Sequence, residues 1–230
     1  MNDLVKKIRS RGYWEVIIRP HTFVEKRLPV ITELYPLVER RSVLLRGWDF
    51  PHIDPHVEPH IGVDWVGQES RWEQYLEVWR LYQSGQFFDL FGMAEDWRDQ
   101  SSLWPPSEDW RPGATLSVPD TIFRFTEIFE FGARLQFTDA GDESVHIEVV
   151  ASGLKGRELV FDVPGRVGFF RKRKASIEKL PYQADLPRVE LIANAKELAL
   201  KPALELFRRF DWDPNIDLLR EIQSKLLQRV

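Results

Sequence analysis

The sequence predicts an α+β protein in which helices pack over an antiparallel or mixed sheet. Hydrophobic residues make up 43% of the chain and charged residues 30%, which is typical of a folded globular protein. Residues 73–93 read as two strands joined by a Ser-Gly turn, and residues 117–120 read as the capped start of a helix. We treat residues 1–230 as a single domain, with a candidate lobe boundary within residues 96–113, where prolines and glycines accumulate.

The first fifth of the chain predicts a helix, a strand and a second helix. Leu4 and Ile8 share one face of a short helix, and residues 13–19 form a β-branched and aromatic strand. Apolar positions in residues 28–43 keep helical spacing, and Pro36 is expected to kink or shorten that helix.

Residues 73–93 contain the clearest hairpin. Val78 and Trp79 point to opposite faces of its first strand, a Ser-Gly pair forms the turn, and residues 86–93 return as the second strand. Apolar side chains on both sides predict that each face of these strands is covered. Further strands are expected at residues 60–68, 145–151, 157–163 and 189–193.

The most secure helix begins after Ser117. This serine is placed to cap it, with Pro119 in the first turn and Asp120 near the positive end of the helix dipole. The apolar face consists of Ile122, Phe125, Phe129 and Ala133. The charged residues expected on or near the opposite face, at spacings that allow ion pairs, are Arg124, Glu127, Glu130 and Arg134.

The C-terminal region predicts two more helices. Pro202 is expected to start the first, which covers residues 203–210, and residues 211–214 break it. The second carries an apolar stripe at three- and four-residue spacing. The members of this stripe are Leu219, Ile222, Leu226 and Val230.

Aromatic residues are concentrated in the middle of the chain, where seven of the nine tryptophans fall between residues 48 and 110. Large rings bury much area in cores and also dominate contact surfaces. Ring density without a catalytic signature favours a non-enzymatic binding or accessory protein that contacts a protein partner or a second copy of itself. For the tryptophans themselves, a core built from these rings is the preferred interpretation, and a ring-lined groove or partner surface is the alternative. The candidate contact residues are Trp48, His52, His56, His60, Trp65, Trp104 and Trp110.

A Pro-His unit occurs three times in residues 51–62, so that three histidines lie four residues apart. Nitrogens that share one zinc ion lie about 3.3 Å apart, whereas residues four apart on an extended strand are separated by about 13 Å. The prolines exclude a continuous α-helix. The spacing therefore predicts no metal and no other cofactor. The alternative is a metal-dependent hydrolase in which a tight turn gathers a divalent metal such as zinc between His52, His56, His60 and Asp64.

Residues 171–174 form the only basic run, and two phenylalanines precede it directly. Cations beside rings suit phosphate contact and base stacking, so nucleic-acid contact is a further alternative. The net charge of −4 and the pI near 5.8 argue against a broadly basic nucleic-acid-binding surface. The members of the run are Arg171, Lys172, Arg173 and Lys174.

Several classes of protein are excluded by missing features. Without cysteine, the chain has no disulfide, thiolate metal ligand or cysteine nucleophile. It contains no glycine-rich phosphate loop, dinucleotide fingerprint, nucleophile elbow or His-Glu-x-x-His motif. No apolar run approaches the roughly 20 residues of a membrane-spanning helix, and the first residues lack the apolar segment of a secretory signal. We therefore expect a cytoplasmic protein with no membrane partner.

Overall fold

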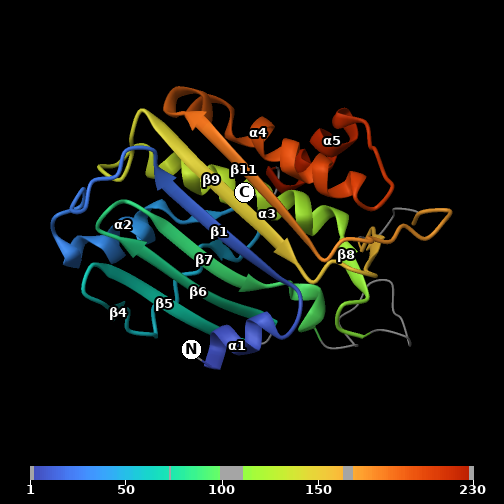
Figure 1. Ribbon diagram of the computed structural model, residues 1–230, viewed down its shortest axis with the longest axis horizontal. Coiled ribbons are helices and arrows are strands. Elements are labelled where there is room, and N and C mark those ends of the chain that lie inside the picture. Colours follow the sequence, from blue (N-terminus) through green and yellow to red (C-terminus); the bar gives the residue numbers. More distant parts are fainter. Residues whose placement is uncertain (1–2, 73, 99–110, 163–167, 228–230) are drawn as a thin grey trace.

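A large antiparallel sheet forms the centre of the molecule in the computed structural model, which describes residues 3–72, 74–98, 111–162 and 168–227. Its seven strands follow the order β11-β9-β1-β7-β6-β5-β4 (Figure 1). They are β1 (Tyr13–Pro20), β4 (His60–Ile61), β5 (Trp65–Trp72), β6 (Tyr75–Tyr82), β7 (Phe87–Gly92), β9 (Ser144–Ser152) and β11 (Lys179–Pro187). The predicted α+β class is confirmed.

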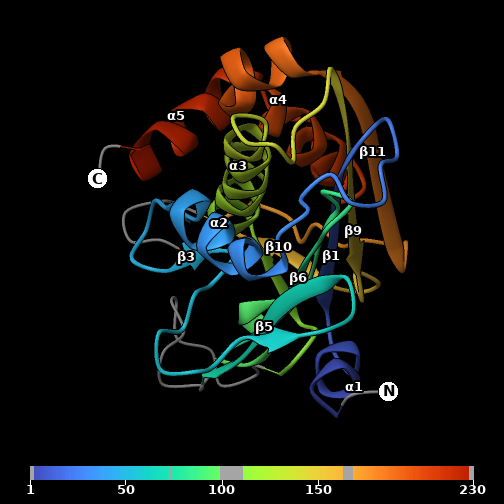
Figure 2. The ribbon, with the colours of Figure 1, turned by 90° about the vertical axis from the view of Figure 1, so that its left-hand side faces the viewer.

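Helices cover the two faces of this sheet unequally. Four of them lie on one face, whereas α1 packs on the other face against β6 and β7 (Figure 2). The helices are α1 (Asp3–Arg9), α2 (Leu34–Arg41), α3 (Val118–Leu135), α4 (Arg188–Arg208) and α5 (Ile216–Leu227), with short 3-10 turns η1 (Ile31–Glu33) and η2 (Ala94–Asp96). None of the described helices combines the length and apolar character that crossing a bilayer requires.

Two small ladders complete the described secondary structure. In one, β2 (Val43–Leu44) pairs antiparallel with β3 (Asp49–Phe50), just after α2. In the other, β8 (Thr115–Ser117) pairs parallel with β10 (Glu158–Val160), immediately before α3. The predicted strand at residues 157–163 is therefore present in part, but it joins β8 and not the large sheet.

The sequence pattern explains the core on the helix-covered face. Strand β1 alternates strictly, so that Trp14, Val16 and Ile18 are buried beneath the helices. Helix α3 begins as predicted, because the Ser117 hydroxyl accepts a hydrogen bond from the Asp120 amide at 3.1 Å. The predicted apolar residues of α3 are all buried, and they are Ile122, Phe125, Phe129 and Ala133.

The hairpin between β6 and β7 has the predicted turn. The Tyr82 amide donates to the Gln86 carbonyl at 2.9 Å, and Gly85 adopts a φ of +86°, which glycine tolerates best. Val78 faces α1 and Trp79 faces the larger core, as the alternation predicts. Strand β5 overlaps the strand that was expected at residues 60–68, and β9 covers the one expected at 145–151.

Two predictions near the C-terminus are wrong. Residues 189–193 form the start of α4, and the strand is the preceding segment β11, whose Pro181 and Pro187 obscure its character. Proline is compatible with β11 because this strand lies at the edge of the sheet. Pro202 lies inside α4 and does not start a helix, while the irregular residue of α4 is Asn194, with φ −132° and ψ 23°.

The second helix is shorter than the pattern of residues 28–43 suggests. A 3-10 turn, η1, precedes α2, and Pro36 lies in the first turn of α2, where its missing N–H has no helical partner to lose. At the C-terminus, Leu219 and Ile222 of α5 are buried as predicted. The side chains of Leu226 and Val230 lie outside the described residues.

A buried ion pair connects distant parts of the chain. The side chains of Asp96 and Arg157 are each 1% exposed, and Asp96 Oδ1 accepts from Arg157 Nη1 at 2.8 Å. The amides of Gly12 and Gly113 also donate to the Asp96 carboxylate, each at 2.8 Å. The large sheet contains strands from both sides of the segment 96–113, much of which lies outside the described residues. The single domain and its lobe boundary therefore stay predictions.

We expect Asp96→Ala to lower the free energy of unfolding by about 3–5 kcal/mol, because the Arg157 guanidinium would remain buried without its counter-charge. Urea denaturation followed by tryptophan fluorescence measures this loss. Asp213→Ala is the control, since it removes the partner of Arg208 from an ion pair whose side chains are 70% and 55% exposed. Equal effects of the two substitutions would contradict the central role of the buried pair.

Candidate functional site

Four rings gather at one end of the β5–β6 hairpin. Trp48 is stacked between His52 and Tyr75, with ring centroids 3.7 Å and 4.1 Å away, and Trp72 meets Trp48 edge-on at 5.9 Å. We call Trp48, His52, Trp72 and Tyr75 the ring cluster. Trp72 is 59% exposed, whereas the other three rings are partly buried. An exposed aromatic surface of this kind is a feature of contact sites.

Local structure brings the ring cluster together from two segments. Trp72 ends β5, Tyr75 begins β6, and the two residues lie opposite each other across the hairpin. Trp48 immediately precedes β3, and His52 follows it by two residues. The carbonyl of His52 accepts a hydrogen bond from the indole of Trp79 at 2.9 Å, which ties this loop to the buried part of β6.

His52 forms a close pair with a carboxylate. Its Nδ1 lies 2.5 Å from Asp49 Oδ1, and its amide donates to Glu77 Oε1 at 2.9 Å. Burial alone lowers the pKa of His52, but the hydrogen bond to Asp49 and the charges of Glu77, Asp49 and Asp54 outweigh burial and raise it. The imidazole therefore favours its cationic form in this position.

Beneath His52 lie two buried carboxyl groups, Glu77 on β6 and Asp89 on β7. Glu77 is 4% exposed and Asp89 is fully buried. Burial raises the pKa of Glu77 to about 7, against the opposing effects of the His52 amide and of the positive charges on His52 and Arg124. Burial and the charge of Glu77 raise the pKa of Asp89 well above its usual range. No hydrogen bond of ordinary geometry reaches either oxygen of Asp89 from the described residues.

A charged stripe on α3 faces these acids. Arg124 Nη1 lies 3.3 Å from Glu127 Oε2, and the charge of Arg124 also lowers the pKa values of Glu77 and Asp89. Arg46 Nε donates to Glu127 Oε1 at 2.8 Å, and Arg46 also pairs with Asp120. The charges of these two arginines and of Arg98 outweigh burial and lower the pKa of Asp120 to about 2.

The position of this stripe corrects an expectation from the sequence. Arg124 and Glu127 were expected on or near the solvent face of α3, but they are 6% and 0% exposed. Arg124 lies over the Phe91 ring of β7, 5.2 Å from its centroid, and Glu127 pairs with Arg46, so this part of α3 is covered by the sheet and by the segment before β3. Glu130 and Arg134 are partly buried, and Arg134 donates to the Ser42 carbonyl.

Two acids of this region favour their protonated forms. The charge network, as we define it, contains the acids Asp49, Glu77, Asp89, Asp120 and Glu127 and the cations Arg46, Arg124 and His52. The raised pKa values of Glu77 and Asp89 reduce the negative charge that is buried in this network.

The structure separates the predicted contact residues. Trp48 and His52 belong to the ring cluster, whereas Trp65 and His60 line a different cavity of about 300 Å³ beside Arg80. Trp65 begins β5 and Trp72 ends it, which places them about 23 Å apart along the strand. Trp104 and Trp110 lie outside the described residues.

The Pro-His segment turns as it leaves the ring cluster. His56 is exposed, with its amide bonded to Asp54 Oδ1 at 2.9 Å, and His60 is exposed on β4. Asp64, the fourth residue of the alternative metal site, is also exposed. Among residues 3–72, 74–98, 111–162 and 168–227, no group of three or more histidine, aspartate or glutamate side chains is arranged to hold a metal ion.

Acids lie beside most of the basic run. Arg171 Nη2 lies 2.6 Å from Asp211 Oδ2, with Arg173 Nη1 at 3.8 Å from the same oxygen. Lys172 Nζ lies 3.5 Å from Glu158 Oε2. Phe170 is fully exposed beside them. The run is therefore a mixed-charge surface, on which a nucleic-acid strand would compete with Asp211 for the arginine side chains.

Sequence reasoning missed Trp72, Tyr75, Glu77 and Asp89 as site residues. A signal for the two acids was present, because Glu77 alternates with Trp79 and Leu81. Asp89 alternates in the same way with Phe87 and Phe91, so both acids occupy positions that the pattern assigns to the core. A carboxyl group at such a position indicates a shifted pKa.

Glu77→Gln is expected to change how stability depends on pH. Because the folded state raises the pKa of Glu77, the stability linked to its proton is present below about pH 4.5 and is lost as the pH rises through about 7. The wild-type free energy of unfolding should therefore fall by about 3 kcal/mol relative to Glu77→Gln over this range. Urea unfolding from pH 4.5 to pH 8 measures the difference.

Glu39→Gln is the matched control, since Glu39 is an exposed glutamate on α2. It should leave the pH profile of the wild type unchanged. A Glu77→Gln profile parallel to that of the wild type would contradict the raised pKa of Glu77.

The chain matches no model in a scan of protein families, no protein in a search of the curated proteins, and no fold in a search of the solved structures.

Proposed function

We propose that the chain is a non-enzymatic binding protein that holds a basic segment of a protein partner on the ring cluster. The single observation that carries this proposal is the exposed Trp72 ring at the edge of the Trp48 stack, which also holds His52 and its partner Asp49. A lysine or arginine side chain placed over an indole is attracted by the ring and by nearby carboxylates.

Charge around the ring cluster supports a cationic partner. Three acids, Asp49, Glu77 and Asp54, lie close enough to His52 to raise its pKa. Asp49 lies against His52 within the cluster, and its side chain keeps 22% exposure. Electrostatic complementarity of this kind raises association rates and selects among partners. A basic segment is therefore the occupant that this surface favours.

The alternative functions have weaker support. A metal-dependent hydrolase would need ligands that converge, and the described residues of the Pro-His segment do not converge. Nucleic-acid contact through residues 171–174 would have to displace the acids Asp211 and Glu158 from the basic side chains. A second copy of the chain is the other partner that the proposal allows, with its own basic run as the segment bound.

Trp72→Ala should weaken binding of a short lysine- and arginine-rich peptide by about tenfold or more, because exposed rings at the centre of an interface carry much of its energy. Calorimetric titration of the full chain measures this. Phe137→Ala is the matched control, since Phe137 is 58% exposed and Trp72 is 59% exposed. The control substitution should leave the affinity unchanged.

Two outcomes decide the proposal. Equal binding of the basic peptide and of its glutamate-substituted counterpart, or no binding of either, rejects a cationic partner. A concentration-dependent dimer that Trp72→Ala abolishes, detected by light scattering, would identify a second copy as the occupant and reject a separate partner.

A further inference from the structure

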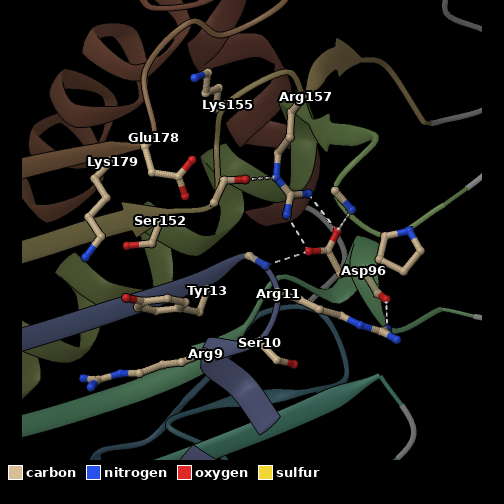
Figure 3. A pocket seen from close by; sticks show the side chains of 14 residues that line it. Arg9, Ser10, Arg11, Tyr13, Asp96, Ser152, Lys155, Arg157, Glu178 and Lys179 are labelled. Carbon is tan, nitrogen blue, oxygen red and sulfur yellow. Dashed lines mark hydrogen bonds and ion pairs between the residues drawn. The ribbon is translucent and has the colours of Figure 1, made fainter. Parts of the chain in front are cut away.

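A cavity of about 670 Å³ lies at one end of the sheet, and it shares no residue with the ring cluster. It is lined by the loop between α1 and β1, the end of β9 with the turn after it, and the start of β11, together with Asp96 and residues 112–113 (Figure 3). Its volume falls within the range of sites that bind small molecules.

Three neighbouring strands contribute a row of side chains to this cavity. Tyr13 on β1 and Lys179 on β11 both pair in register with Ser152 on β9, so the three side chains leave the sheet on the same face. Figure 3 shows Ser152 between Lys179 and Tyr13. A ligand that touches Ser152 therefore also comes within reach of the Lys179 ammonium.

Cations dominate the lining once the internal ion pair is set aside. Apart from Asp96 and Arg157, the charged lining residues are Arg9, Arg11, Lys155, Lys179 and the single acid Glu178, and Arg9 pairs with Glu15 at 2.8 Å. Lys155 and Lys179 are exposed and form no ion pair within the described residues. This concentration of positive charge occurs in a chain whose net charge is −4. Such a cavity attracts anions.

The carboxylate of Asp96 does not cancel this charge. Arg157 and the amides of Gly12 and Gly113 already hold its two oxygens. The Asp96 carbonyl accepts from Arg11 Nη1, and the Arg11 guanidinium lies over the Trp97 ring at 4.0 Å. Arg11 is thus already engaged by Asp96 and Trp97, and among the described lining residues the free cations of the cavity are Lys155 and Lys179.

An unmet hydrogen-bonding group marks the same cavity. Ser152 is 1% exposed, and its hydroxyl has no hydrogen-bond partner within the described residues. A buried hydroxyl without a partner is unfavourable, and native proteins rarely leave one. An oxygen of a bound ligand would accept its hydrogen bond.

We propose that this cavity binds a small polyphosphate ligand. Phosphate oxygens accept hydrogen bonds from ammonium groups and from hydroxyls, which are the groups supplied by Lys155, Lys179 and Ser152. A volume of about 670 Å³ suits a small ligand, whereas a nucleic-acid strand would extend beyond this site along the surface.

Calorimetric titration of the full chain with ATP and with inorganic triphosphate tests this proposal. The double variant Lys155→Ala/Lys179→Ala should bind both at least tenfold more weakly, and Ser152→Ala should weaken binding several-fold. The control Lys172→Ala/Lys174→Ala makes the same charge change at the basic run and should leave the affinity within a factor of two. Both lysines of the cavity are exposed, so their removal leaves the fold intact, which circular dichroism verifies.

The other outcomes overturn the proposal. Absence of binding of either compound up to about 1 mM excludes a site of useful affinity. Equal losses in the two double variants would indicate diffuse attraction to net charge. Binding of a single-stranded oligonucleotide in the absence of triphosphate binding would assign the cations to nucleic acid. None of these measurements depends on Trp72, so the binding function proposed for the ring cluster stands or fails separately.

Discussion

The carboxyl groups of Glu77 and Asp89 lie between the sheet and α3, where water does not reach them. A buried carboxylate must find a counter-charge or keep its proton, since its bare desolvation is too unfavourable. Arg124 supplies positive charge from α3, but it also pairs with Glu127. The carboxyl groups that lack a full counter-charge favour their protonated forms. Burial accordingly raises the pKa of Glu77 to about 7.

This constraint reaches the surface through Arg46. Arg46 lies two residues before Trp48 in the chain. Its guanidinium forms ion pairs with Asp120 and Glu127 of α3. The loop that carries Trp48 and His52 is therefore anchored at one end by buried ion pairs. At the other end it is held by the hydrogen bonds of His52 to Glu77 and Trp79. The position of the ring cluster thus depends on buried charge, and a change in that charge would alter the position of the surface rings.

Opposite charges gather at the two candidate sites. The ring cluster is surrounded by acids, whereas the cavity beside Asp96 is lined mainly by cations. The net charge of −4 conceals this separation, because it averages over both. A ligand responds mainly to the charges close to its site and not to the total charge of the chain. Salt screens the interactions between exposed charges that are more than about 10 Å apart.

The sequence by itself determined the elements whose signals are local. The Ser117 cap, the β6–β7 turn at Gly85 and the alternation of β1 each depend on neighbouring residues, and the structure contains all three. The sequence did not predict β11. An edge strand tolerates prolines that would disrupt an inner strand, and the local sequence does not show which strand lies at the edge. It also failed for Pro202, which the surrounding packing of α4 accommodates.

Tertiary structure alone decided which side chains meet. Trp72 and Tyr75 contact Trp48 because the turn of the β5–β6 hairpin lies beside the segment that precedes β3. Trp65 lies far from this cluster because it is at the other end of the extended strand β5. Periodicity marked Glu77 and Asp89 as core positions, but it could not place Arg124 above them. Charge interacts through space across the fold, whereas a sequence pattern reports only the faces of one element at a time.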